Sequence, residues 1–125
     1  MPSKEPGTKL EVRPVHHGEC TVLHVRGELT EDFAPATLFR DEIVSLSVDG
    51  PPRLVLDLGG VTTWDDEGVG AVVAAVKRVM TAGGKLVIAA APADLMERFQ
   101  RQRLDQRFEP RETVEQAVNE FGVPK

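Results

Sequence analysis

The chain has 125 residues, which is the usual size of a single domain. Its 15 Lys and Arg against 20 Asp and Glu leave a formal net charge of -5, which argues against a dedicated nucleic-acid binder. A single cysteine excludes an intramolecular disulfide, and this fits a cytoplasmic protein. The longest apolar run, at residues 69–76, is too short to span a bilayer, so membrane insertion is not expected.

Residues 1–8 are expected to form a disordered tail, because Pro and Gly interrupt a segment that has little to bury. Alternating apolar residues then predict two strands, Lys9–Val15 and Cys20–Arg26, which a turn at residues 16–19 joins into a hairpin. Pro14 has no N–H to donate to a neighbouring strand, so the first strand is predicted at an edge of the sheet.

The middle of the chain predicts a helix, a buried strand and a second helix. The first helix runs from about Ala34 to Ser47, with Pro35 in its first turn, where proline is favoured. The run Leu54–Leu58 is apolar on both faces, which is typical of a central parallel strand covered by helices. The second helix is expected from about Asp66 to Thr81, and Gly83-Gly84 is a typical C-terminal end for it.

The last third of the chain predicts two further strands and two further helices. A buried strand, Leu86–Ala90, precedes a helix that is expected from Pro92 to about Arg101. A short strand, Phe108–Glu109, is followed by a helix that begins at Thr113, where Gln116 is placed to form a capping box.

The order of these elements is β-β-α-β-α-β-α-β-α, which indicates the α/β class. Crossover helices make the later strands parallel, whereas the opening hairpin is antiparallel. We therefore expect a single domain over residues 9–122, built on a mixed sheet with its helices mainly on one face. Residues 123–125 are expected to be a short tail.

Three consecutive carboxylates, Asp65-Asp66-Glu67, mark the junction between the central strand and the second helix. In open α/β sheets, ligands and partners usually bind where strands end and helices begin. Asp65 is expected to cap the helix, where aspartate stabilises by about 1 kcal/mol relative to alanine. Carboxylates that are neighbours at a helix start diverge, so we expect neither a metal ion nor another cofactor.

Five short segments carry a family resemblance through their order and spacing. They are Gly27-Glu28-Leu29, Leu54–Leu58 with Val61-Thr62, Asp65 with Gly68 and Gly70, Gly83–Leu86, and Thr113–Ala117. Together they resemble the STAS domain, and within it the bacterial anti-sigma factor antagonists, over roughly Leu10 to Phe121.

The resemblance implies partner switching in signal transduction, not enzymatic catalysis. An antagonist of this kind binds an anti-sigma factor that is also a serine kinase, and thereby frees the sigma factor for transcription. Phosphorylation of the first serine in the family's Asp-Ser-Ser-Gly-Leu-Gly signature ends the binding. The resemblance places the partner surface on two segments, which are Gly27, Glu28, Leu29 and Thr30, and Thr63, Trp64, Asp65, Asp66, Glu67, Gly68, Val69 and Gly70.

The chain departs from this signature at the switch itself. Asp66 replaces the phosphorylated serine and Glu67 the second serine, so neither position can accept phosphate from a Ser/Thr kinase. Phosphoserine carries about -1.5 to -2 charges, and the two carboxylates supply a similar charge permanently. Two hypotheses follow: constitutive binding to a partner that is basic there, which we favour, or a permanently phosphorylated-like state that the kinase ignores.

Other interpretations stay open at this point. The chain would also fit a STAS subunit of another assembly, such as a stress-sensing or lipid-transport complex, or a carboxylate-based metal- or ligand-binding protein. As an antagonist, the protein is expected to be a monomer or weak homodimer. Thr62 and Thr63 are alternative phosphate acceptors. Trp64 is expected to pack in the core, and would anchor an interface if it were exposed.

The remaining polar residues carry structural expectations. Asp57 is expected to order a turn at Gly59-Gly60, and Cys20 to be a small apolar strand residue. Solvent-facing side chains are expected at two groups of basic residues, namely Arg98, Arg101, Arg103 and Arg107 on and after the third helix, and His16, His17 and His24 in or beside the hairpin turn.

Overall fold

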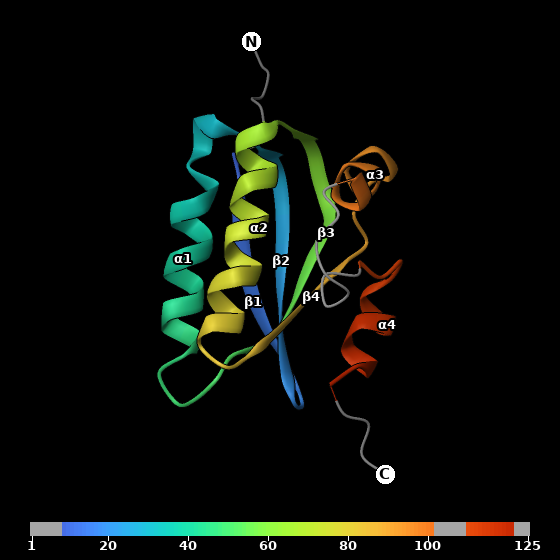
Figure 1. Ribbon diagram of the computed structural model, residues 1–125. Coiled ribbons are helices and arrows are strands. Elements are labelled where there is room, and N and C mark those ends of the chain that lie inside the picture. Colours follow the sequence, from blue (N-terminus) through green and yellow to red (C-terminus); the bar gives the residue numbers. More distant parts are fainter. Residues whose placement is uncertain (1–8, 102–109, 122–125) are drawn as a thin grey trace.

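The computed structural model describes residues 9–101 and 110–121. Its centre is a four-stranded sheet, formed in the order β1 (Glu11–His17), β2 (Cys20–Leu29), β3 (Arg53–Trp64) and β4 (Lys85–Ala89). The first two strands pair antiparallel and the later pairs are parallel, which confirms the predicted mixed sheet (Figure 1). The strand that contains Pro14 lies at the edge of this sheet, as its missing N–H predicts.

The helices lie mainly on one face of the sheet, as predicted. The described residues form α1 (Pro35–Leu46), α2 (Asp66–Thr81), α3 (Ala93–Arg101) and α4 (Val114–Asn119), with a short 3-10 helix, η1 (Glu31–Phe33), before α1. α1 and α2 lie side by side along the sheet, and α3 shares the core that they cover (Figure 1). α4 contributes instead to a smaller cluster on the opposite face.

Strand β3 is apolar on both faces because both are covered. Leu54, Leu56 and Leu58 alternate into the larger core cluster beneath α1 and α2. Val55 points the other way into the smaller cluster, which Ala117 of α4 closes. The alternation along β3 therefore confirms the prediction of a central strand covered on both sides.

Strand β3 is longer than predicted. It continues past Leu58 to Trp64, because its parallel pairing with β2 resumes beyond two register shifts and ends at Leu29 opposite Trp64. The predicted turn at Gly59-Gly60 is therefore wrong, since both glycines lie inside β3. The role expected of Asp57 is nevertheless present, because its carboxylate accepts a hydrogen bond from the N–H of Gly59 at 2.9 Å.

The hairpin turn is shorter than predicted. β1 continues through His17, which pairs with Cys20, so only residues 18–19 form the turn. Gly18 has a φ of 56°, a conformation that glycine adopts without strain. This positive φ explains how the chain can reverse within two residues.

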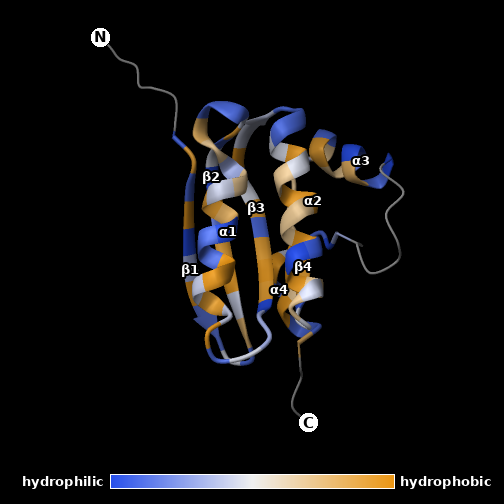
Figure 2. Ribbon diagram, turned by 60° about the vertical axis from the view of Figure 1, so that its left-hand side comes forward, coloured by the Kyte–Doolittle hydropathy of each residue, from blue (hydrophilic) through white to orange (hydrophobic). Residues whose placement is uncertain are grey.

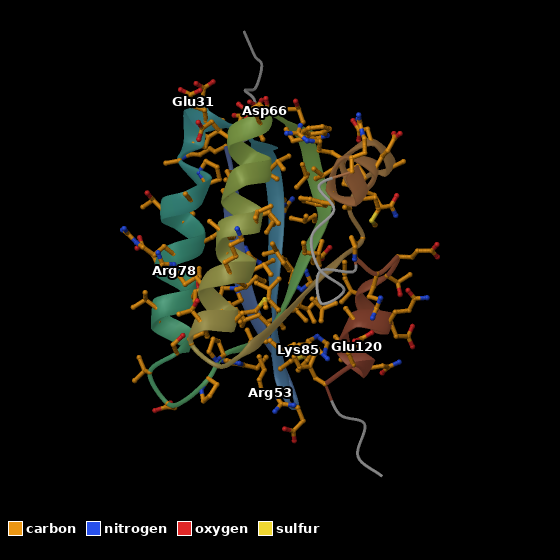
Figure 3. All side chains as sticks on the ribbon, in the orientation of Figure 1. Glu31, Arg53, Asp66, Arg78, Lys85 and Glu120 are labelled. Carbon is orange, nitrogen blue, oxygen red and sulfur yellow. The ribbon has the colours of Figure 1, made fainter. Side chains whose placement is uncertain are left out.

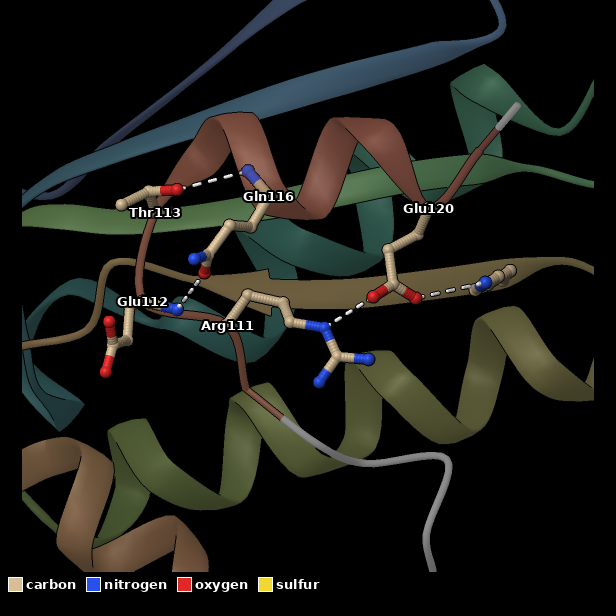
Figure 4. A network of polar contacts seen from close by, with 6 residues as sticks. Arg111, Glu112, Thr113, Gln116 and Glu120 are labelled. Atoms are coloured by element: carbon tan, nitrogen blue, oxygen red, sulfur yellow. Dashed lines mark hydrogen bonds and ion pairs between the residues drawn. The ribbon is translucent and has the colours of Figure 1, made fainter. Parts of the chain in front are cut away.

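The C-terminal helix begins with the predicted cap. The hydroxyl of Thr113 accepts a hydrogen bond from the N–H of Gln116 at 3.1 Å. The Gln116 side chain reaches back one residue further than a capping box requires, and accepts from the N–H of Glu112 at 3.1 Å (Figure 4). The sheet also extends beyond β4, because Arg111 forms a parallel bridge with Ala89.

Several predictions fall on parts of the chain that the structure does not describe. They are the tails at residues 1–8 and 123–125, the strand at residues 108–109, and the side chains of Arg103 and Arg107.

Candidate functional site

The two segments expected to form the partner surface meet at one end of the sheet. Parallel pairing places Leu29 at the end of β2 opposite Trp64 at the end of β3. Both strands stop there, so η1 and the first turn of α2 leave the sheet side by side. Figure 3 shows Glu31 and Asp66 together at this end of the molecule.

Asp65 fastens the two segments to each other. One carboxylate oxygen accepts a hydrogen bond from the N–H of Gly68 at 2.9 Å, which caps α2 as predicted. The other accepts from the N–H of Glu31 at 3.0 Å, and this second partner was not foreseen. These backbone hydrogen bonds, chiefly the one from Glu31, hold the pKa of the Asp65 carboxyl below its usual value. Asp65 is therefore an ionised clamp between η1 and α2.

Gly68 lets the first turn of α2 approach β2 closely. A Cβ atom at this position would lie 2.0 Å from the backbone oxygen of Leu29, which no side chain can occupy. Gly70 differs, because a Cβ there would meet nothing within 4 Å. Gly68 therefore serves the packing of the surface from below, together with the buried Leu29 and Val69.

The carboxylates that remain exposed define what we call the acidic end. Its members are Glu31, Asp32, Asp66 and Glu67. They surround the N-terminus of α2, whose dipole stabilises nearby negative charge by about 0.3–1 kcal/mol per group. Figure 2 shows both helix starts at this end as hydrophilic. Glu31 and Asp32 were missed by the sequence reasoning, because only the three-dimensional pairing of β2 with β3 brings η1 beside α2.

Asp66 contacts a residue far along the chain. Its Oδ1 atom lies 2.7 Å from a guanidinium nitrogen of Arg98 in α3. The same guanidinium lies over the ring of Trp64, with its central carbon 6.0 Å from the ring centroid. The prediction of a merely solvated Arg98 is therefore wrong. Sequence reasoning had no signal for this contact, which depends on how α3 docks beside α2.

Trp64 is half-buried, so it lies between the core residue that was expected and the exposed interface anchor that was the alternative. Part of its ring packs against the larger core cluster. Its Nε1–H donates to the carboxylate of Asp94 at 3.2 Å, again on α3. Thr62 and Thr63 are exposed beside it. The surface at this end thus combines an aromatic ring, an Arg–carboxylate pair and two hydroxyl groups.

The other polar residues form structural contacts. His24 lies within β2, and its Nδ1 atom is 2.6 Å from a carboxylate oxygen of Asp57, so its prediction as a solvated turn residue is wrong. Cys20 is buried, and burial raises the pKa of its thiol, as suits a small apolar strand residue. Within residues 9–101 and 110–121, no group of three His, Cys, Asp or Glu side chains is placed to hold a metal ion.

Comparison with known proteins connects this geometry to a family. The sequence-family model of the STAS domain matches residues 11–117 of this chain. No curated protein sequence matches the chain significantly. None of the described helices is long and apolar enough to cross a membrane.

Solved structures share the fold, among them the following three. An anti-sigma-factor antagonist (STAS) domain protein from Planctomyces limnophilus is 18% identical, with a TM-score of 0.70, and the match covers 88% of this chain and 97% of that one. The anti-sigma factor antagonist SpoIIAA in its unphosphorylated form is 17% identical, with a TM-score of 0.64, over 89% of this chain and 96% of that one. The murine anion transporter Slc26a9 is 17% identical, with a TM-score of 0.66, over 80% of this chain but 17% of the transporter.

Proposed function

The chain belongs to the STAS domain family, whose model covers most of its length, and we propose that it works there as an anti-sigma factor antagonist. In this role it is a non-enzymatic binding module of the bacterial cytoplasm. It binds an anti-sigma factor that is also a serine kinase, and so regulates transcription indirectly. Two of the structural neighbours, one of them SpoIIAA, carry the name of this activity and match almost their whole length.

One observation carries the proposal: the first turn of α2 has a fixed backbone and exposes the side chain of residue 66. Asp65 and Gly68 lock the backbone of this turn against β2 and η1 from below. Asp66, the residue that the family resemblance aligns with the phosphorylated serine, points outward with 85% of its side chain exposed. A turn whose backbone is held in place and whose residue 66 faces solvent is what a partner needs in order to read that position.

Binding is then constitutive, because a serine kinase cannot phosphorylate the carboxylate at residue 66. The helix dipole at the start of α2 favours the negative charge of Asp66 and Glu67. The fold therefore tolerates two carboxylates in place of the two serines of the family signature. The partner in this proposal accepts the protein permanently, and its control must lie elsewhere than in phosphorylation of residue 66.

The test is capture of purified candidate anti-sigma factor kinases. The unmodified protein should capture its partner kinase equally well with and without ATP. Asp66→Ser should capture it without ATP and lose it when ATP allows phosphorylation. Thr62→Val/Thr63→Val, with Asp66 kept, serves as the control for phosphorylation of the neighbouring hydroxyls.

Two outcomes contradict the proposal in different ways. Tighter capture by Asp66→Ser in the absence of ATP would mean that the carboxylate blocks binding, as in the permanently phosphorylated-like state. ATP-dependent release of the unmodified protein, absent from the double threonine variant, would move the switch to Thr62 or Thr63.

A second function, as a STAS subunit of a larger assembly, has one observation in its favour. The same fold occupies a small share of the Slc26a9 transporter chain. In that case the protein should elute from size-exclusion chromatography with an assembly partner and should ignore the kinase. A thermal shift with Mg²⁺, Ca²⁺ and nucleotides checks the remaining alternative of a ligand-binding protein, which a clear stabilisation would favour.

A further inference from the structure

Helix α3 is docked onto the end of β3 and the first residue of α2 by a cluster of contacts, which we call the α3 latch. Its members are Trp64, Asp66, Asp94 and Arg98. The indole N–H of Trp64 donates to Asp94, while Arg98 pairs with Asp66 and lies over the indole ring. The latch joins the residue at the switch position to an element that no part of the family signature covers.

The geometry of α3 presents Arg98 to Asp66 in a defined place. Leu95 and Phe99, on the inner side of the same helix, are fully buried in the larger core cluster and anchor it. The indole ring beneath the guanidinium restricts it further, since cations are attracted to aromatic faces. Arg98 keeps 29% of its side chain exposed, against 85% for Asp66, so the arginine is the more enclosed partner of the pair.

We propose that Arg98 neutralises the carboxylate at the switch position, and that the partner therefore reads Asp66 as part of an ion pair. This inference rests on the proposed function, which it deepens by adding α3 to the partner surface. A single guanidinium balances the single charge of an aspartate. It does not balance a phosphoserine, which carries about -1.5 to -2 charges. At residue 66 the pair thus matches the net charge of an unphosphorylated serine, the state in which such a partner binds, while Glu31, Asp32 and Glu67 keep the rest of this end acidic.

The Arg98–Asp66 pair affects partner binding through its electrostatic field, and it adds little to the stability of the fold. Exposed ion pairs stabilise a fold little, because solvent screens them and their side chains lose freedom. Two opposite charges 2.7 Å apart nevertheless cancel most of each other's field at the distance of an approaching partner. Removal of Arg98 alone would leave the charge of Asp66 unbalanced at the position where the family signature has a neutral serine.

The first experiment uses the isolated protein and the fluorescence of its only tryptophan, Trp64. Arg98→Gln should shift the emission of Trp64, because the guanidinium leaves the ring. Asp66→Asn should shift it in the same direction, because the carboxylate helps to hold the guanidinium there. Glu67→Gln removes the adjacent carboxylate and should leave the emission unchanged. Equal spectra for the unmodified protein and Asp66→Asn would show that the carboxylate does not position Arg98.

The second experiment measures binding of the same purified kinase to four proteins. Arg98→Gln should weaken binding by about tenfold, because it uncovers the charge of Asp66. The double variant Asp66→Asn/Arg98→Gln should restore it to within about threefold, because a neutral pair replaces a neutral pair. Arg101→Gln removes the same charge from an exposed position of the same helix and should change little.

The outcomes separate this inference from the proposed function. Failure of the double variant to recover would make Arg98 a direct contact of the partner and overturn neutralisation of Asp66. Unchanged binding by Arg98→Gln would overturn the inference and leave the antagonist function intact. A kinase that binds none of the proteins, the unmodified one included, would overturn the proposed function, while the fluorescence of Trp64 would still report on the pair.

Discussion

Two regions of the molecule each contain an Arg–carboxylate ion pair, but one pair is exposed and the other is enclosed. At the acidic end, Arg98 pairs with a carboxylate that is 85% exposed. Around α4, Arg111 and Lys85 both contact Glu120, whose side chain is only 24% exposed (Figure 4). The hydrogen bond from Arg111 is the main cause that holds the pKa of Glu120 below its usual value. Enclosure therefore turns one Arg–carboxylate pair into a structural bond and leaves the other available to a partner.

The two ends of α2 also share one device. A Cβ at Gly68 would lie 2.0 Å from the Leu29 backbone oxygen, and a Cβ at Gly84 would lie 2.0 Å from that of Pro52. Close backbone approach thus fixes the helix at its start and just beyond its end. The two regions therefore share a close backbone approach, and they differ in the exposure of the ion pair beside it.

The largest expected effect is at this close backbone approach. Gly68→Ala should destabilise the protein by about 2–3 kcal/mol, since the new methyl group forces β2 and α2 apart. Gly70→Ala, two residues along the same helix, has open space and should stabilise by about 0.5–1 kcal/mol, as alanine does in helices. Urea denaturation followed by circular dichroism measures both. Equal stability of the two variants would mean that α2 does not need its close approach to Leu29.

The next largest effect is a difference in stability between variants of the two N-terminal helix caps, Asp65 of α2 and Thr113 of α4. Asp65→Ala should cost about 1–2 kcal/mol, because the backbone N–H groups of both Gly68 and Glu31 lose their acceptor. Thr113→Ala, at the start of α4, removes a single hydrogen bond, so it should cost about 0.5–1 kcal/mol. The same urea titrations apply. A larger cost at Thr113 would contradict the view of Asp65 as a clamp on two segments.

A third effect depends on pH and belongs to the region around α4. Glu120→Gln should cost about 1 kcal/mol at neutral pH, because Arg111 and Lys85 lose their anionic partner. A carboxyl group whose pKa is lowered by folding adds stability above its unfolded pKa, and this is lost as the pH falls through the folded value. The gap between variant and unmodified protein should therefore shrink below about pH 4. Thermal melts across a pH series measure it, and a gap that widens in acid would reverse the assigned sign.

The comparison also shows how far sequence reasoning reaches. Strand alternation and helix spacing predicted the order of the elements, because each pattern depends on neighbours in sequence. The cap at Asp65 was predictable for the same reason, since its acceptor role toward Gly68 is local. The second contact of Asp65, with Glu31, joins residues that come together only when β2 pairs with β3.

The contacts that were missed are those made across the sheet or between helices. His24 meets Asp57 only through the parallel register of β2 and β3. Arg98 meets Asp66 only through the docking of α3, and its charge alone is typical of a solvated helix face. Local patterns thus predict elements and caps, whereas the pairing of distant charges requires the packed structure.

The smallest expected effect on stability is at the switch position itself. Asp66→Ala should change the free energy of unfolding by less than about 0.5 kcal/mol, because an exposed ion pair gains little in water. Its cost should fall further at 1 M salt, whereas the cost of Glu120→Gln should persist, since enclosed charges are screened less. Urea titrations at low and high salt compare the two. A cost at Asp66 as large as that at Glu120 would make the Arg98 pair a structural bond, and stability would then explain the pair without any role in partner binding.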